Sequence, residues 1–222
     1  MRQTLFSLIA LALAAGFASS AHAQGGLALG VKIGTLGPGA ELTAFLAPEV
    51  NLRVGGNYFT YSYDDEIDDI EYEAKLHMQT LLAVLDWHMF ENNFRVSAGV
   101  VINDNSLDVE GTPTEAEEVG GNLYTPAEMG TLQGSASFDH FAPYVGIGYG
   151  NAVADDVALS FVFDLGVVFQ GSPDIELSSS GALANDPQFQ ADLKQEEQDV
   201  QDDADAFSIY PVLAFGVAYY FW

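Results

Sequence analysis

The chain has 222 residues, no cysteine, and 32 Asp and Glu against 6 Lys and Arg, which gives a formal net charge of −26. Because binding to phosphate backbones needs clustered Lys and Arg, this charge excludes nucleic acid as a partner. The lack of cysteine excludes disulfides, thiolate metal sites and cysteine nucleophiles. Hydrophobic residues still make up 49% of the chain, more than a disordered acidic chain carries, so we expect a folded domain.

The first 23 residues have the pattern of a secretory signal peptide. Arg2 supplies a positive start, residues 5–15 form an uncharged apolar stretch, and residues 21–23 (Ala-His-Ala) fit a small-residue cleavage site. The apolar stretch is shorter than the roughly 20 residues that a membrane-spanning helix needs. We therefore expect cleavage before Gln24 and a mature chain of residues 24–222.

Apolar residues then recur at every second position, a pattern that predicts β-strands. Between residues 157 and 170 the odd positions are bulky and apolar, whereas the even positions include Ala, Ser, Asp and Gly. Small residues opposite large ones are typical of a narrow barrel interior with lipid outside. The predicted strands are 26–35, 40–46, 50–62, 75–88, 94–103, 141–150, 157–170 and 208–221.

The connections between these segments differ in length. Short ones follow the second, fourth and sixth segments, and long ones follow the third, fifth and seventh. With a periplasmic N-terminus, this places the short turns inside the cell envelope and the long loops outside. The chain ends in alternating aromatic residues, with Tyr219 and Phe221 two positions apart and Trp222 last.

Together these features resemble a small outer-membrane β-barrel protein of Gram-negative bacteria, similar to the eight-stranded barrel domain of the outer membrane protein A class. The resemblance covers residues 24–222 and rests on the signal, the alternation, the loop lengths and the aromatic C-terminus. It implies an all-β, eight-stranded antiparallel transmembrane β-barrel in the outer membrane. It also implies lipid, lipopolysaccharide and the barrel assembly machinery as partners. Tyr219, Phe221 and Trp222 would form the C-terminal insertion signal.

Most of the acidic residues fall in the three long loops, at about 64–73, 103–139 and 171–207, which together hold 25 of the 32. One interpretation is solvation and mutual repulsion of exposed loops. The alternative is loose binding of divalent cations, because carboxylate oxygens are the ligands that such ions prefer. The candidate cation contacts are Asp64, Asp65, Glu66, Asp68 and Asp69. No metal site with defined ligands and no cofactor is predicted.

The last long loop has a helix signal. Asp186 can cap the helix and Pro187 suits its first position. A thin apolar stripe follows at Phe189, Leu193, Val200 and Ala204. We expect a short helix that either packs as a lid on the barrel mouth or contacts a partner.

A few charged residues fall on the inward face of the predicted strands. These are Lys32, Glu41, Arg53, Asp86, Arg95 and Asp164. Because buried charges must be paired, we predict a salt-bridge network that fills the lumen. The alternative is a gate that opens when the pairs rearrange.

Nucleophile and base candidates are few. They are Ser135, Ser137, Asp139, His140 and His77. Asp139 and His140 are adjacent, so in a strand they would point to opposite faces. We predict no catalytic site and a structural or surface-interaction role in the cell envelope. The alternatives are a narrow gated channel for ions or small solutes, and a lipid-modifying enzyme of the outer leaflet.

Overall fold

The structure, a computed structural model, describes residues 26–67, 70–89, 93–153 and 158–221. The predicted signal peptide, the predicted cation contacts Asp68 and Asp69, and Trp222 lie outside these ranges. The described part of the chain is all-β, as the sequence predicted, and it has two α-helices where the sequence predicted one. Neither helix has the length and apolar character needed to cross a membrane.

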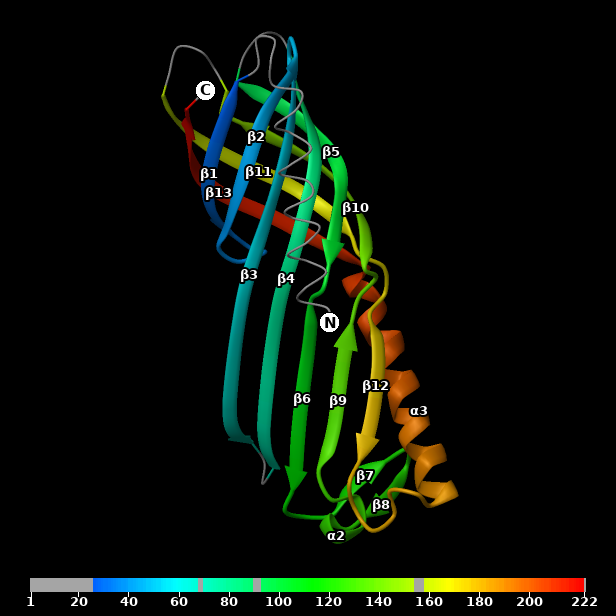
Figure 1. The fold of residues 1–222 in the computed structure, drawn as a ribbon. Helices are drawn as coiled ribbons and strands as arrows, with labels where there is room; N and C mark the ends of the chain where they lie inside the picture. The colour runs from blue at the N-terminus through cyan, green and yellow to red at the C-terminus, as the bar shows by residue number, and fades with distance from the viewer. Residues whose placement is uncertain (1–25, 68–69, 90–92, 154–157, 222) are drawn as a thin grey trace.

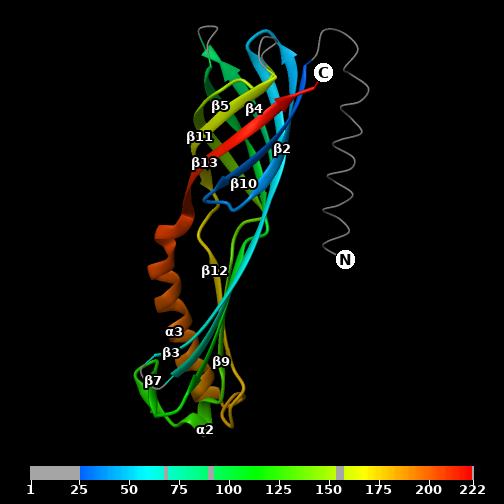
Figure 2. The same cartoon turned by 90° about the vertical axis from the view of Figure 1, so that its left-hand side faces the viewer.

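Antiparallel pairing joins eight of the described strands into a closed ring (Figures 1 and 2). In order around the ring they are β1 (Leu27–Gly34), β2 (Gly39–Ala47), β3 (Val50–Ile67), β4 (Ile70–His88), β5 (Phe94–Asn103), β10 (Phe141–Tyr149), β11 (Leu159–Phe169) and β13 (Ile209–Tyr220). Each strand pairs with the next, and β13 pairs with β1. The ring therefore has no free edge at this level of the molecule.

Alternation decides which side chains enter the ring. On β11, Phe161 is 78% exposed, whereas Val162 and Asp164 are buried. Inward-facing residues are small where the side chain of a large neighbour fills the interior. A Cβ added to Gly166 would lie 2.5 Å from the hydroxyl of Tyr144, which occupies the interior. The outer face is therefore large and apolar, and the interior is filled by close packing.

Beyond the ring, β3 and β4 continue as part of a second, open sheet. Its order is β3-β4-β6-β9-β12, with β6 (Ser106–Pro113), β9 (Leu132–Ser137) and β12 (Asp174–Ser179). We call this the distal sheet. The sequence analysis was wrong to end the third strand at 62 and begin the fourth at 75, because the pairing of β3 with β4 continues to Ile67 and Ile70. The outer half of β4 also pairs with β6, so both of its edges are bonded despite the acidic sequence.

The two long connections, from β5 to β10 and from β11 to β13, contain further elements. These are β7 (Glu117–Val119), β8 (Asn122–Tyr124), α2 (Pro126–Met129), α3 (Pro187–Ala204) and the 3-10 helix η2 (Asp205–Ser208). A small apolar core joins them, formed by Val119, Tyr124, Met129, Phe189 and Leu193. The distal region is thus a packed unit rather than a set of loops.

Helix α3 begins as the sequence predicted. The side chain of Asp186 accepts hydrogen bonds from the backbone N–H groups of Gln188 and Phe189. The expected position as a lid on the ring mouth is wrong, because α3 lies alongside β12 in the distal region (Figures 1 and 2). Its buried Phe189 and Leu193 pack into the apolar core that the β7–β8 hairpin and α2 provide.

Side chains of α3 also bond to the outer edge of β12. Glu197 Oε2 accepts from the N–H of Leu177 at 3.1 Å, and Gln201 Oε1 accepts from the N–H of Ile175 at 3.2 Å. Gln201 Nε2 donates to the carbonyl of Pro173 at 2.7 Å. Exposed strand edges are templates for pairing with other chains. The helix therefore occupies this edge of the distal sheet.

Hydrogen bonds join α3 to the β7–β8 hairpin. Asp192 accepts hydrogen bonds from the hydroxyl of Tyr124 and from Asn122 Nδ2, the latter at 2.8 Å. The bond to Asp192 raises the pKa of the Tyr124 hydroxyl to about 12. The same bond lowers the pKa of the Asp192 carboxyl below its usual 3.8. The contact therefore favours a charged Asp192 and a neutral Tyr124.

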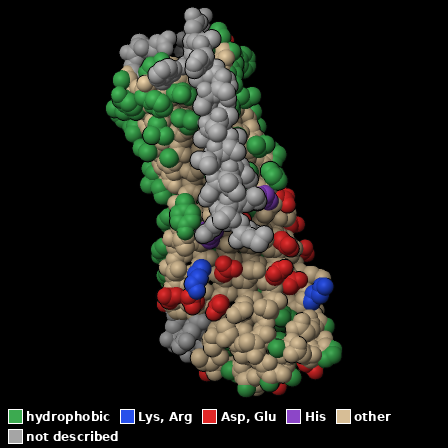
Figure 3. Space-filling view, in the orientation of Figure 1, with side chains coloured by type: hydrophobic (Ala, Val, Ile, Leu, Met, Phe, Trp, Pro, Cys, Tyr) green, Lys and Arg blue, Asp and Glu red, His purple; other side chains and the backbone are tan. Residues whose placement is uncertain are grey.

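The surface divides along the length of the molecule. Hydrophobic side chains gather over the ring in Figure 3, and most of the visible Asp and Glu side chains lie over the distal region. Exposed apolar side chains on the ring include Val31, Trp87, Ile147, Phe161 and Phe215. The apolar surface thus coincides with the ring.

Candidate functional site

The interior of the ring holds a compact group of charged side chains centred on Arg53. Its Nε and Nη2 donate to the two carboxylate oxygens of Asp86, at 2.9 and 3.0 Å. Its Nη1 donates to Asp164 Oδ2 at 2.8 Å and to Glu41 Oε2 at 3.4 Å. One guanidinium from β3 therefore joins carboxylates from β2, β4 and β11. Bidentate contacts of this type are among the stronger charge-assisted hydrogen bonds.

The two remaining cations complete the group. Lys32 Nζ lies 2.8 Å from Glu41 Oε2. Arg95 Nη2 lies 2.7 Å from Asp164 Oδ1, and Arg95 Nε lies 3.7 Å from Asp86 Oδ1. Arg95 Nη1 also donates to the carbonyl of Gly150. We call these six charged side chains, Lys32, Glu41, Arg53, Asp86, Arg95 and Asp164, the charge plug.

The charge plug is buried and electrically balanced. None of its side chains is more than 8% exposed. Three cations face three carboxylates, so the group is neutral when all six are ionised. Buried ions persist where Coulomb attraction and hydrogen bonds together offset the loss of hydration. The contacts above provide both.

The charge plug crosses the ring completely. Strands β3 and β11 are four strands apart in either direction around the ring, and the contact between Arg53 and Asp164 joins them directly. Apolar layers lie on both sides of this level. One contains Val84, Val101, Tyr144 and Val212, and the other contains Ala28, Val162 and Ala218.

The space left between these layers is small. A cavity of about 20 Å³ lies beside Lys32, Arg53 and Asp164. That volume holds about one water molecule. The described part of the ring interior is therefore filled at the level of the charge plug.

All six side chains that the sequence assigned to the lumen lie in this one group, including Glu41 and Arg53 from the second and third strands. The sequence analysis missed Ser97, whose hydroxyl donates to Asp86 Oδ1. It lies two residues after Arg95 on the same face of β5, and that spacing was the available signal. Tyr144 and His88 are also buried without having been predicted to be, and His88 Nε2 lies 3.1 Å from Asn51 Nδ2.

The described candidate cation contacts, Asp64, Asp65 and Glu66, lie on β3, far from the charge plug. Asp64 pairs across the strands with Glu73, and Glu66 pairs with Glu71. The hydroxyl of Tyr63 donates to Asp65. Across the described ranges, no three acidic or histidine side chains are grouped closely enough to hold a metal ion. Loose cation contact by these carboxylates stays a prediction.

The candidate nucleophiles and bases are spread over the junction between ring and distal sheet. Ser135 and Ser137 lie on β9, and Asp139 and His140 lie between β9 and β10. The imidazole of His140 packs edge-on against the phenyl group of Phe141. His77, on β4, has its Nδ1 3.2 Å from the hydroxyl of Thr60 and its ring against Tyr58.

At the C-terminus, the side chains of Tyr219 and Phe221 are 56% and 50% exposed on the outer surface. This is the face that the predicted insertion signal requires. The signal itself stays a prediction.

No protein-family model matches the chain, and no curated protein matches it in sequence. Solved structures do match. The crystal structure of CarO2 from Acinetobacter baumannii matches with a TM-score of 0.58 and 20% identity, covering 88% of this chain and 98% of that one. CarO from the same organism matches with a TM-score of 0.56 and 21% identity, covering 87% and 97%.

These neighbours are outer-membrane β-barrel proteins. The resemblance expected from the sequence, to a small outer-membrane β-barrel protein, is confirmed at the level of the fold. A particular likeness to the outer membrane protein A class is not shown.

Proposed function

We propose that this protein is a non-enzymatic, eight-stranded transmembrane β-barrel of the outer membrane with a closed lumen. The distal region then stands outside the cell as a platform for surface interactions. The observation that carries the proposal is the contact between Arg53 and Asp164, which joins strands on opposite sides of the ring. A lumen crossed by paired charges fits a structural or binding role better than a conducting one.

The dimensions of the long strands support this orientation. A transmembrane β-strand needs about 9–11 residues. Strands β3 and β4 have 18 and 19 residues, so about half of each extends past the bilayer. The ring carries exposed apolar side chains and the distal region carries most of the acidic ones, as a protein with one end in lipid and the other in water requires.

The energy of the charge plug supports a closed state. Separating a buried pair so that one charge is left unpaired costs about 3–5 kcal/mol. A passage through the ring has to separate Arg53 from Asp164 and also displace the apolar layer around Val84 and Tyr144. Opening by thermal fluctuation alone is therefore rare.

Planar-bilayer recording on the refolded mature chain tests the proposal. We expect no discrete conductance steps from the wild type. A variant with Lys32, Arg53 and Arg95 all replaced by Met removes the cations of the charge plug, and a second variant with Asp199, Asp202 and Asp203 replaced by Asn changes three charges on exposed positions of α3. Discrete steps in the wild type would contradict the proposal. Steps that change in the first variant and persist unaltered in the second would establish the narrow-channel alternative.

Further expectations belong to this proposal. Outer-membrane lipid and lipopolysaccharide surround the ring, and the barrel assembly machinery inserts it through the C-terminal segment that includes Tyr219 and Phe221. No resident cofactor takes part, and divalent cations bind loosely to the acidic distal residues. Signal cleavage leaves Gln24 as the first residue, which intact-mass measurement of the protein purified from outer membranes will test. Unchanged lipid A mass on expression tests the non-enzymatic role.

A further inference from the structure

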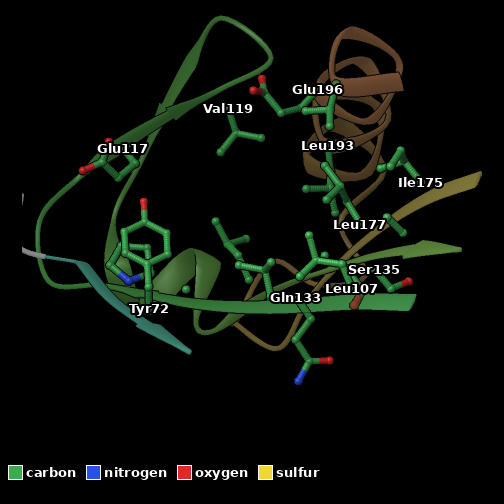
Figure 4. A pocket seen from close by; sticks show the side chains of 18 of the residues that line it. Tyr72, Leu107, Glu117, Val119, Gln133, Ser135, Ile175, Leu177, Leu193 and Glu196 are labelled. Carbon is green, nitrogen blue, oxygen red and sulfur yellow. The ribbon is translucent and has the colours of Figure 1, made fainter. Parts of the chain in front are cut away.

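The distal region contains a pocket of about 420 Å³ (Figure 4). Its floor is one face of the distal sheet, with Val109 on β6, Gly134 on β9 and Leu177 on β12. Leu193 on α3 and Val119 on β7 line it on the side away from the sheet. Small-molecule sites commonly have volumes of about 300–1,000 Å³ and mainly apolar linings. The distal pocket fits that description.

A glycine makes the floor concave. Gly134 lies directly between Val109 and Leu177 in a row of cross-strand partners. The two flanking side chains rise from the sheet and the central position is empty. A Cβ added there would lie 3.2 Å from Leu177 Cδ2, a flexible side-chain end, and 4.0 Å from the carbonyl oxygen of Val109. The backbone therefore tolerates a side chain at Gly134, and that side chain would occupy the pocket.

The charged part of the lining is acidic. Glu117, Glu118 and Glu196 line the pocket, and none of the described lining residues is Lys, Arg or His. Figure 4 shows the ring of Tyr72 rising from the sheet on the same side as Glu117. Glu196 Oε2 also accepts from the N–H of Gly120 at 3.4 Å, which holds it at the pocket between α3 and the hairpin. An aromatic ring beside carboxylates is a favourable place for an ammonium group.

We propose that the distal pocket binds an amphiphilic cation, a small molecule with an apolar body and an ammonium group. The apolar body fills the hollow over Gly134, between Val109 and Leu177. The ammonium group lies beside Tyr72 and Glu117, and Glu118 and Glu196 add to the negative potential of the pocket. Anionic amphiphiles are disfavoured, because three carboxylates in a region of strong negative charge repel them. The proposal rests on the proposed function only in placing the pocket outside the cell.

Titration calorimetry on the full mature chain in zwitterionic lipid nanodiscs tests this proposal, with phenylbutylamine as the probe and phenylbutyrate as its anionic counterpart. Empty nanodiscs supply the background. We expect saturable binding of the amine at one site per chain, and binding of the carboxylate that is weaker by roughly tenfold or more. Equal binding of the two probes, or no amine signal above empty nanodiscs, would overturn the proposal.

Two variants locate the binding. Gly134→Phe fills the hollow, and we expect it to abolish amine binding while the circular-dichroism spectrum of the chain stays that of the wild type. The triple variant Glu117→Gln, Glu118→Gln, Glu196→Gln should weaken amine binding roughly tenfold and remove the preference over phenylbutyrate. The α3 variant with Asn at 199, 202 and 203 carries the same change in net charge at residues that do not line the pocket, and it should bind within about twofold of the wild type.

The remaining outcomes distinguish a failure of the binding proposal from a failure of the closed-lumen proposal. Equal losses in the two triple variants would show a general field effect in place of a site. A dimer that Gly134→Phe dissociates, seen by sedimentation, would assign the pocket to a second copy of the chain. Amine binding in a wild type that also conducts would leave this inference standing and remove the closed lumen. A silent wild type that binds no amine would do the reverse.

Discussion

Replacing Arg53 by Met should destabilise the protein strongly, because it leaves the charge plug unbalanced. Three cations face three carboxylates in the wild type, and the variant leaves two cations against three carboxylates in a site no more than 8% exposed. Removing one partner of a buried pair costs about 3–5 kcal/mol. We expect a loss of that size in the free energy of unfolding, measured by urea unfolding in lipid vesicles with the fluorescence of Trp87, which lies on the outer face of β4.

The double variant Arg53→Met, Asp164→Leu is the matched control. It restores the balance, with Lys32 facing Glu41 and Arg95 facing Asp86. Because apolar replacements of buried pairs are often neutral, we expect the double variant to recover about 2 kcal/mol of the loss. A double variant less stable than Arg53→Met would show that desolvated charge is not the cause, and the account of the plug would fail.

Three further predictions concern other parts of the chain. Asp186→Ala removes the cap of α3 and should lower the local stability of the helix by about 1 kcal/mol, measured by hydrogen exchange in its first turn. The pKa of Asp192 is lowered in the folded protein, so its carboxylate stabilises the docked helix fully at pH values above the usual pKa of 3.8 and loses that contribution as the pH falls below it. Limited proteolysis should therefore show α3 released in acid. In Tyr124→Phe the release should occur at a higher pH. Gly99→Ala would place a Cβ 2.2 Å from the carbonyl oxygen of Ala83, so the variant should lose much of the β-sheet circular-dichroism signal that the folded wild type gives.

Much of the ring could be predicted from the sequence because lipid and a narrow interior impose a strict alternation. Along β11 the bulky residues are exposed and the intervening ones are buried, in the phase that the period-two pattern predicted. The same phase assigned Arg95 and Asp164 to the interior before any partner was known. Asp186 and Pro187 likewise marked the start of α3, since capping depends on local sequence alone.

The distal region could not be predicted in the same way. Its short strands have one face in water and contain acidic residues, and such a sequence pattern is typical of a loop. Residues 64–67 and 70–73 are strand in the structure because β3 and β4 continue their pairing and β6 bonds to the outer half of β4. The bonds from residues 70–73 of β4 to residues 110–113 of β6 join segments more than thirty residues apart in the sequence, beyond the reach of any local pattern.

The sequence by itself determined which side chains of the ring face inward, because the phase of a strand follows from alternation and small residues mark a crowded interior. Only the tertiary structure decided their partners. Arg53 meets Asp164, 111 positions away, because ring closure places β3 opposite β11. The distal pocket likewise exists only after β6, β9, β12, α3 and the hairpin assemble, since Gly134 forms a hollow only when Val109 and Leu177 stand on either side of it.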